Sequence, residues 1–401
     1  MKTVVLAWRF VVARPATALL NLLLLSLGLA CICAFLLVSD QVRAAFARDV
    51  AGIDLVVGAK GSPLQLVLAG VFHLDVAPGN VPLKAVMQLQ AAPRVASVIP
   101  MSLGDSFRGY RIVGTTPDYL AHFKASYAQG ELWTRTMQVV IGADVARSAD
   151  MQLRTTFIGS HGLGETGQKH GDSPFRVVGM LAPCACVLDR LILTPLESVW
   201  HVHDAQVTGD DSAHDAAMAD SREVTLALVR YASPLAAASL PRFVNTTTAM
   251  QAASPALEIT RLLQQLGLGG DALAGVGALL LALAAISVFV AMWTAVRERR
   301  ADLALLRFLG APATRLAALL LTEALGLALA ASVLGLALGH ALVALLGRLL
   351  LQAQSVNVTG WAWSANEWWV PALACAVALL AALLPIASAY RVDAGELLHA
   401  H

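Results

Sequence analysis

The most informative part of the sequence is Arg297-Glu298-Arg299-Arg300-Ala301-Asp302-Leu303-Ala304-Leu305-Leu306-Arg307-Phe308-Leu309-Gly310-Ala311. It concentrates charge between two hydrophobic segments, residues 271–296 and 314–348. Each of these is long enough to cross the roughly 30 Å hydrocarbon core of a bilayer. A short charged segment between two such runs is typical of a loop at a membrane surface.

The charged segment is itself expected to be a short amphipathic helix. Asp302 follows Arg299 at a spacing that supports a helix, and Leu305, Phe308 and Leu309 form one apolar edge. Gly310 favours a helix end. The pattern fits both a contact for a cytoplasmic partner and a simple positively charged anchor.

The composition indicates an integral membrane protein. Of the 401 residues, 57% are hydrophobic and 14% are charged, and the mean hydropathy is +0.67. These values are too apolar for an ordinary soluble chain of this length. A formal net charge of +1 gives no indication of nucleic-acid binding.

The hydrophobic runs predict a membrane α-helical fold with four transmembrane helices and a large extracytoplasmic α+β domain inserted between helices 1 and 2. The predicted segments are an amphipathic N-terminal segment (1–15), transmembrane helix 1 (16–39), the external domain with its stalk (40–270), transmembrane helix 2 (271–296), the coupling helix (297–313), transmembrane helix 3 (314–348), an external loop (349–368), transmembrane helix 4 (369–390) and a tail (391–401).

The basic residues predict the orientation. They cluster before the first span, between spans two and three, and after span four, whereas residues 349–368 contain no Lys or Arg. By the positive-inside rule, the N-terminus, the segment 297–313 and the C-terminus are cytoplasmic. Trp361, Trp363, Trp368 and Trp369 suit the membrane interface without any ligand.

The external region alternates short β-rich runs with helical stretches. Strands are expected at 53–57, 95–100, 111–113, 137–141, 175–180, 191–193 and 224–229, and helices at 64–68, 117–123, 143–151, 195–201 and 233–240. Residues 255–268 carry an apolar stripe at helical spacing and are expected to continue into span two as a stalk.

The charged stretch also resembles the cytoplasmic loop signature of the FtsX-like, or MacB-type, permeases of ABC systems. The resemblance rests on residues 299–311, on Glu323 with Gly326, Gly335 and Gly339, and on the segments 384–385 and 390–398. Asp302 stands where Glu is usual in the family, and Ala394 where Pro is usual.

The resemblance implies a permease in a bacterial inner membrane that is not an enzyme by itself. Two permease copies would pair with a separate ABC-type ATPase dimer, which holds ATP and Mg²⁺, and its motion would be transmitted to the periplasmic domain. The residues implied to contact the ATPase are Arg299, Arg300, Asp302, Leu305, Arg307, Phe308, Leu309 and Gly310. A periplasmic adaptor or a lipoprotein is a further partner that relatives use. The cargo stays open among lipoproteins, peptides and small molecules.

The sequence lacks a phosphate-binding loop. The nearest pattern, residues 162–170, has neither Lys directly after its second Gly nor Ser or Thr after that. The chain therefore carries no ATPase motif of its own.

Two further groups of residues have alternative interpretations. Glu323 is expected to be a polar contact within span three or a side chain that reaches the interface, and the glycines after it allow close helix contacts. External His and Cys residues could bind zinc, which makes a membrane-anchored periplasmic metal-binding protein the alternative function. Residues 54–63 and 189–193 also resemble stretches of small permeases found beside zinc-responsive genes. The candidate ligands are His201, His203, Cys184, Cys186, His161 and His170.

The two cysteines leave several chemistries open. A disulfide across one intervening residue is expected to be strained. Free thiols, metal ligation and a redox role all fit Cys184 and Cys186 at this stage.

Overall fold

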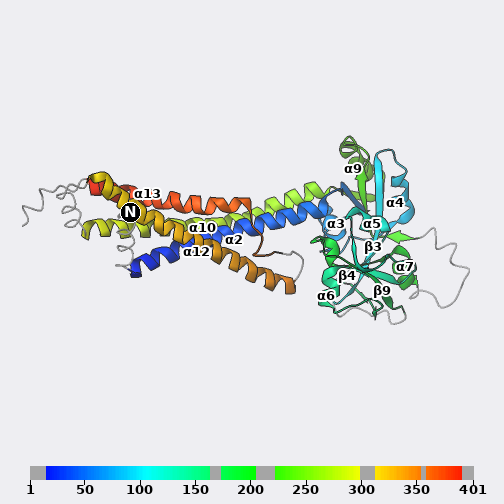
Figure 1. Cartoon of the computed structure of the whole chain (residues 1–401). Coiled ribbons are helices and arrows are strands. Elements are labelled where there is room, and N and C mark those ends of the chain that lie inside the picture. The colour runs from blue at the N-terminus through cyan, green and yellow to red at the C-terminus, as the bar shows by residue number, and fades with distance from the viewer. Residues whose placement is uncertain (1–14, 163–172, 205–221, 299–311, 354–357, 391–401) are drawn as a thin grey trace, which may run out of the picture. The chain divides into compact units, whose positions relative to one another are not determined.

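The computed structural model describes residues 15–162, 173–204, 222–298, 312–353 and 358–390. The chain forms two compact units, of which the first comprises Met1–Ala44 with Gln265–His401, and the second Ala45–Gln264. Figure 1 shows long helices in the first unit and a mixed sheet with covering helices in the second.

Long helices make up the first unit. They are α2 (Pro15–Val50), α10 (Pro255–Glu298), α12 (Ala313–Ala353) and α13 (Trp369–Tyr390), the last preceded by the 3-10 turn η2 (Ala365–Trp368). Four segments of the described residues are long and apolar enough to cross a membrane: Ala18–Val50, Gly275–Thr294, Ala317–Leu349 and Ala365–Ala387. The predicted architecture of four such helices, with a large domain between the first and second, is confirmed.

Small side chains line the core of the helical unit. Ala374, Ala378 and Ala382 lie four residues apart on α13, and none of them is more than 1% exposed. Lipid tails are as apolar as a leucine side chain, so helix association in a membrane depends on close packing of small residues. The unit therefore packs helix against helix in the manner expected for a bilayer.

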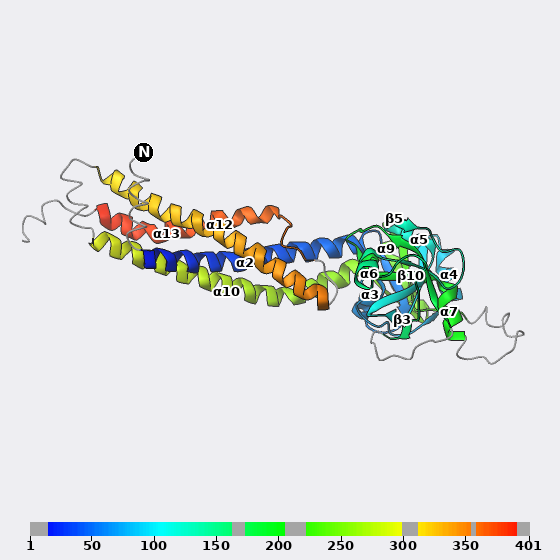
Figure 2. The ribbon, with the colours of Figure 1, turned by 60° about the horizontal axis from the view of Figure 1, so that its bottom comes forward.

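Glycines bring α10 and α12 close to α2. A Cβ atom at Gly277 of α10 would lie 2.9 Å from Ile32 Cγ1. On α12, a Cβ at Gly335 would lie 2.8 Å from Leu29 Cβ, and one at Gly339 would lie 2.8 Å from Cys33 Cβ, one turn further along α2. Figure 2 shows α2 running beside both helices. Only glycine allows these approaches without movement of the helices.

The second unit is built on a mixed sheet with the strand order β13-β1-β12-β3-β4-β10-β6-β9-β5, with β7 paired to β9 and β8 to β3. These strands are β1 (Leu55–Ala59), β3 (Val95–Phe107), β4 (Tyr110–Thr115), β5 (Tyr127–Gly130), β6 (Gln138–Ile141), β7 (Thr156–Phe157), β8 (Ser160–His161), β9 (Phe175–Leu181), β10 (Leu191–Pro195), β12 (Leu226–Tyr231) and β13 (Met250–Ala253). A separate pair joins β2 (Val81–Pro82) to β11 (Glu223–Val224).

Helices cover both faces of this sheet. Alternate residues of β1 show the division: Val56 lies in one hydrophobic cluster, whereas Leu55 and Val57 lie in another. The first cluster includes residues of α3 and α5, and the second includes residues of α4 and α9. The helices of this unit are α3 (Pro63–Gly70), α4 (Leu83–Gln90), α5 (Pro117–His122), α6 (Ala143–Ser148), η1 (Val187–Arg190), α7 (Leu196–Asp204) and α9 (Ala236–Thr247). The result is the mixed domain that the alternating pattern predicted.

Candidate functional site

The predicted coupling segment lies between two described helices. Helix α10 ends at Glu298, one residue after Arg297, and α12 begins at Ala313. The implied contact residues Arg299, Arg300, Asp302, Leu305, Arg307, Phe308, Leu309 and Gly310 lie outside the described residues. Their role as an ATPase contact stays a prediction.

Glu323 lies within α12 and is half-buried. Its neighbours Leu320 and Ala324 are 4% and 2% exposed, so this part of the helix faces the packed interior of the unit. Both interpretations of Glu323, a polar contact within the span and a side chain that reaches the interface, stay predictions.

A polar network joins α2 to the segment between α12 and α13. The Asp40 carboxylate accepts hydrogen bonds from Ser364 Oγ and, at 2.9 Å, from Asn366 Nδ2. Gln41 exchanges two hydrogen bonds of 2.9 Å with the backbone of Thr359. This α2 segment therefore holds the described part of the connecting segment at Thr359 and again at Ser364 and Asn366.

His340 extends the network from α12. Its Nδ1 lies 2.6 Å from the carbonyl oxygen of Gly360, and its Nε2 lies 3.1 Å from Glu367 Oε2. A carbonyl oxygen only accepts hydrogen bonds, so Nδ1 must carry a proton. The second contact ties the imidazole ring to the Glu367 side chain of η2, just before α13. Both side chains are largely shielded from solvent, with 17% of His340 and 3% of Glu367 exposed.

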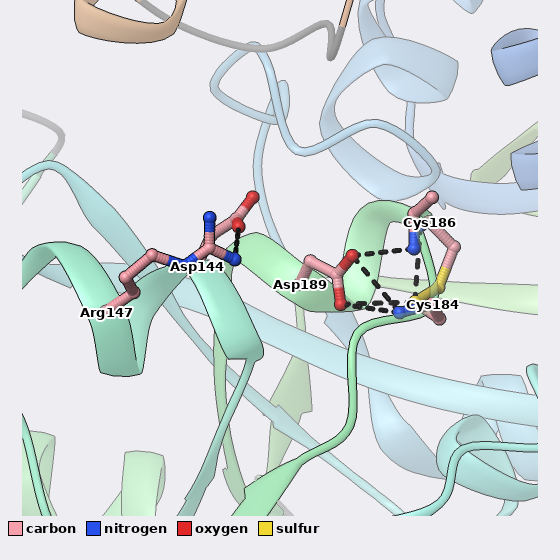
Figure 3. Close-up of polar contacts among 6 residues, drawn as sticks. Asp144, Arg147, Cys184, Cys186 and Asp189 are labelled. Atoms are coloured by element: carbon pink, nitrogen blue, oxygen red, sulfur yellow. Dashed lines mark hydrogen bonds and ion pairs between the residues drawn. A yellow bond between two sulfur atoms is a disulfide. The ribbon is translucent and has the colours of Figure 1, made fainter. Parts of the chain in front are cut away.

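The two external cysteines form a disulfide, Cys184–Cys186. Ala185 between them adopts a positive φ of 52°. The Asp189 carboxylate accepts hydrogen bonds from the backbone N–H groups of Cys184, at 3.0 Å, and Ala185, at 2.7 Å. Figure 3 shows the carboxylate facing this turn. Of the chemistries left open for these cysteines, the structure thus has a disulfide, in a turn that has its own acceptor.

Burial sets the electrostatics of this turn. Asp189 is 3% exposed, and its burial raises the pKa of the carboxyl group, while the hydrogen bonds from the turn oppose that shift. Asp144 of α6 also raises this pKa, and Arg147, which pairs with Asp144 at 3.0 Å, lowers it. Figure 3 shows the Asp144–Arg147 pair beside the turn.

The candidate zinc ligands do not come together in the part of the chain that the structure describes. A disulfide offers no thiolate for zinc, so the set loses its sulfur ligands. His201 and His203 both lie in helix α7. His161 lies in β8, paired with Asp105, and His170 lies outside the described residues. Among the described residues, no group of three or more His, Cys, Asp or Glu could hold a metal ion.

Two family models match the chain. The MacB-like periplasmic core domain matches residues 18–240, more than half of the chain, and the FtsX-like permease C-terminal domain matches residues 274–393. This chain is an FtsX-like permease with a MacB-like periplasmic core domain. It is therefore an ABC transporter permease of the MacB type, as the charged stretch and the closing segment suggested.

Solved structures of external domains are also similar to this permease. The periplasmic region of MacB from Actinobacillus actinomycetemcomitans is 14% identical, with 54% of this chain and 95% of that chain covered and a TM-score of 0.36. The extracellular domain of the noncanonic ABC-type transporter YknZ from Gram-positive bacteria is 14% identical, with coverages of 50% and 99% and a TM-score of 0.31. No curated protein matches the permease.

The family assignment places the second unit outside the cytoplasm. The core-domain match contains the mixed sheet from β1 to β12, and the C-terminal match contains α12 and α13. FtsX-like permeases lack an ATPase domain. This permease therefore combines a membrane-embedded helical unit with an extracytoplasmic domain.

Proposed function

We propose that two copies of this permease bind a dimer of a separate ABC-type ATPase and transmit its motion to the periplasmic domains. ATP and Mg²⁺ bind in the ATPase, and the N- and C-termini of the permease face the cytoplasm. The segment 297–313 is the contact with the ATPase. The cargo is a lipoprotein, a peptide or a small molecule that is handled outside the membrane, with a periplasmic adaptor or a lipoprotein as a further partner.

The observation that carries this proposal is the length of two helices. Helix α2 has 36 residues and α10 has 44. At 1.5 Å per residue they are about 54 and 66 Å long. The hydrocarbon core of a bilayer is only about 30 Å thick. Each helix therefore has length to spare outside the membrane, as a mechanical link requires.

The extra length is anchored in the core of the second unit. Phe46 of α2 packs edge-on against Phe72, with ring centroids 4.8 Å apart. Asp49 of α2 accepts a hydrogen bond of 3.2 Å from the Val187 N–H. At the start of α10, Ile259 is 7% exposed and belongs to the same hydrophobic cluster. Both helices are thus held by side-chain packing, and a displacement along either helix would reach the sheet.

Co-purification tests the ATPase contact. The tagged permease is extracted with its partner ATPase, and the charge-reversing variants Arg300→Glu and Arg307→Glu are compared with Arg176→Glu, an exposed residue on β9. We expect the first two variants to insert into the membrane normally and to lose the ATPase, while the β9 variant retains it. Full ATPase association in the double variant Arg300→Glu/Arg307→Glu overturns the proposed contact.

A second measurement tests the transmission. Spin labels on exposed positions of the periplasmic domains report the distance between two copies with and without ATP. We expect an ATP-dependent change in the natural chain and a smaller change in Phe46→Ala, which still binds the ATPase. An ATP-independent distance distribution would contradict mechanical transmission even if the ATPase binds.

A further inference from the structure

A small cavity opens in the second unit where β3 leaves its regular pairing. Its volume is about 290 Å³, and it is lined by Val76, Ala77, Gly79, Asn80, Leu103, Gly104, Asp105, Arg111, Gly162 and Thr225. The register of β3 against β4 shifts between Leu103 and Ser106. Bulges of this kind redirect side chains and are frequent beside functional sites.

The neighbouring strand also ends its pairing at this place. The ladder between β12 and β3 stops at Leu226 opposite Met101. Thr225, the residue before, uses its hydroxyl to bind both the N–H and the carbonyl of Leu103, at 2.9 and 3.2 Å. These two hydrogen bonds fix the backbone of β3 at Leu103, beside the cavity. The cavity is therefore a defined feature of the sheet.

Arg111 brings a buried cation to this cavity. Arg111 is 6% exposed, and neither its Nε nor its Nη2 has a hydrogen-bond partner within the described part of the chain. Burial lowers the pKa of the guanidinium, and the charge of Asp75 opposes this effect. An arginine stays protonated under these conditions. The cavity therefore contains a positive charge, two of whose nitrogen donors, Nε and Nη2, meet no acceptor among the described residues.

Asp105 supplies a negative charge to the same cavity. It is 3% exposed and lies on the bulged part of β3, whereas Val76, Ala77 and Leu103 provide apolar wall. A carboxylate has about four acceptor positions, so it can accept a hydrogen bond from a ligand in addition to one from the protein. With Asp75 also nearby, a strongly anionic ligand such as phosphate would be repelled.

We propose that this cavity binds a free amino acid, with its carboxylate on Arg111, its ammonium group next to Asp105 and its side chain against Leu103, Val76 and Ala77. A guanidinium matches a carboxylate in a bidentate geometry. The opposite charges of the site match a zwitterion. The volume lies at the lower end of small-molecule pockets, which favours a single amino acid over a peptide. The site is independent of the ATPase contact proposed above.

The test measures binding to the full chain in detergent. Each common amino acid is added singly at about 10 mM, because a site with few charged contacts binds in the micromolar to millimolar range. Calorimetry and thermal unfolding then compare the amino acid that binds best with two analogues that carry the same side chain. One analogue lacks the amino group and keeps the carboxylate, and the other lacks the carboxylate and keeps the amine. We expect each half to bind at least ~10-fold more weakly than the amino acid.

Variants separate the site from general effects on folding. Arg111→Met removes the guanidinium, and Ala77→Leu narrows the cavity while Arg111 stays in place; each should raise the dissociation constant at least ~10-fold. The matched control Arg176→Met removes an exposed arginine of β9 and should bind normally. Failure of every amino acid to bind overturns the proposal. Equal binding to Arg111→Met, or equal binding of the carboxylate-only compound, overturns it as well.

Discussion

A valine scan of three glycines in α12 tests the helix packing quantitatively. Gly335 and Gly339 approach α2 so closely that an added Cβ would lie 2.8 Å from Leu29 Cβ and Cys33 Cβ. At Gly326, an added Cβ meets nothing within 4 Å. We therefore expect Gly335→Val and Gly339→Val to destabilise the chain, whereas Gly326→Val serves as the matched control.

The magnitude follows from the required shift. Carbon atoms pack at about 3.5–4.0 Å, so each valine must push α2 away by roughly 0.7–1.2 Å. Overpacking of this kind costs about 1–3 kcal/mol. The change in helix propensity is the same for one substitution at three interior positions of one helix, so it cancels in the comparison. The expected difference between Gly339→Val and Gly326→Val is therefore about 1–3 kcal/mol.

Unfolding of the full chain in mixed detergent micelles measures this difference. Helical circular dichroism is followed as the fraction of denaturing detergent rises, and the midpoints of the three variants are compared with the natural chain. Equal midpoints for all three variants would refute the close contact between α12 and α2. A shift confined to Gly335→Val and Gly339→Val supports it.

Three further predictions concern other contacts. Gly142→Ala should destabilise the external domain by more than ~2 kcal/mol, measured by chemical unfolding, because the new Cβ would lie 2.1 Å from the carbonyl oxygen of Leu188. Burial lowers the pKa of His73 to about 3. The folded state therefore keeps this histidine neutral, and the free energy of unfolding falls by about 2 kcal/mol as the pH drops from above the unfolded-state pKa of about 6.5 to pH 5. The variant His73→Asn, which tolerates the positive φ of 55°, should remove this dependence in thermal melts between pH 5 and pH 7.5. Gln41→Ala should weaken the attachment of the segment at Thr359 to α2 by about 1–2 kcal/mol, since two hydrogen bonds are lost. Limited proteolysis should then cleave this segment faster than in the control variant Gln129→Ala, which changes an exposed residue of β5.

Local sequence patterns predicted the elements well because local physics determines them. The runs at 95–100, 191–193 and 224–229 became β3, β10 and β12. Helix α3 starts where the sequence places Ser62 before a proline, and the Ser62 hydroxyl accepts a hydrogen bond from Gln65 N–H. Hydrophobic length alone predicted the four long helices.

The sites were less predictable because they depend on residues distant in sequence. The cavity at Arg111 needs the bulge in β3 and the hydroxyl of Thr225, which follows Arg111 by more than a hundred residues. The disulfide depends on the positive φ of Ala185, and no residue type in that turn predicts this backbone conformation.

The contacts of α2 indicate which of them would respond first to a displacement of this helix. Gly335 and Gly339 hold α2 against α12 through van der Waals contact, which tolerates little change in separation but some sliding along the helix. The hydrogen bonds of Asp40 and Gln41 have fixed directions and lengths near 2.9 Å, and such bonds weaken steeply beyond about 3.5 Å. A slide of α2 by less than one residue would therefore break the bonds to Thr359 while the glycine contacts persist. If α2 carries motion in this permease, the segment between α12 and α13 should be released in step with it.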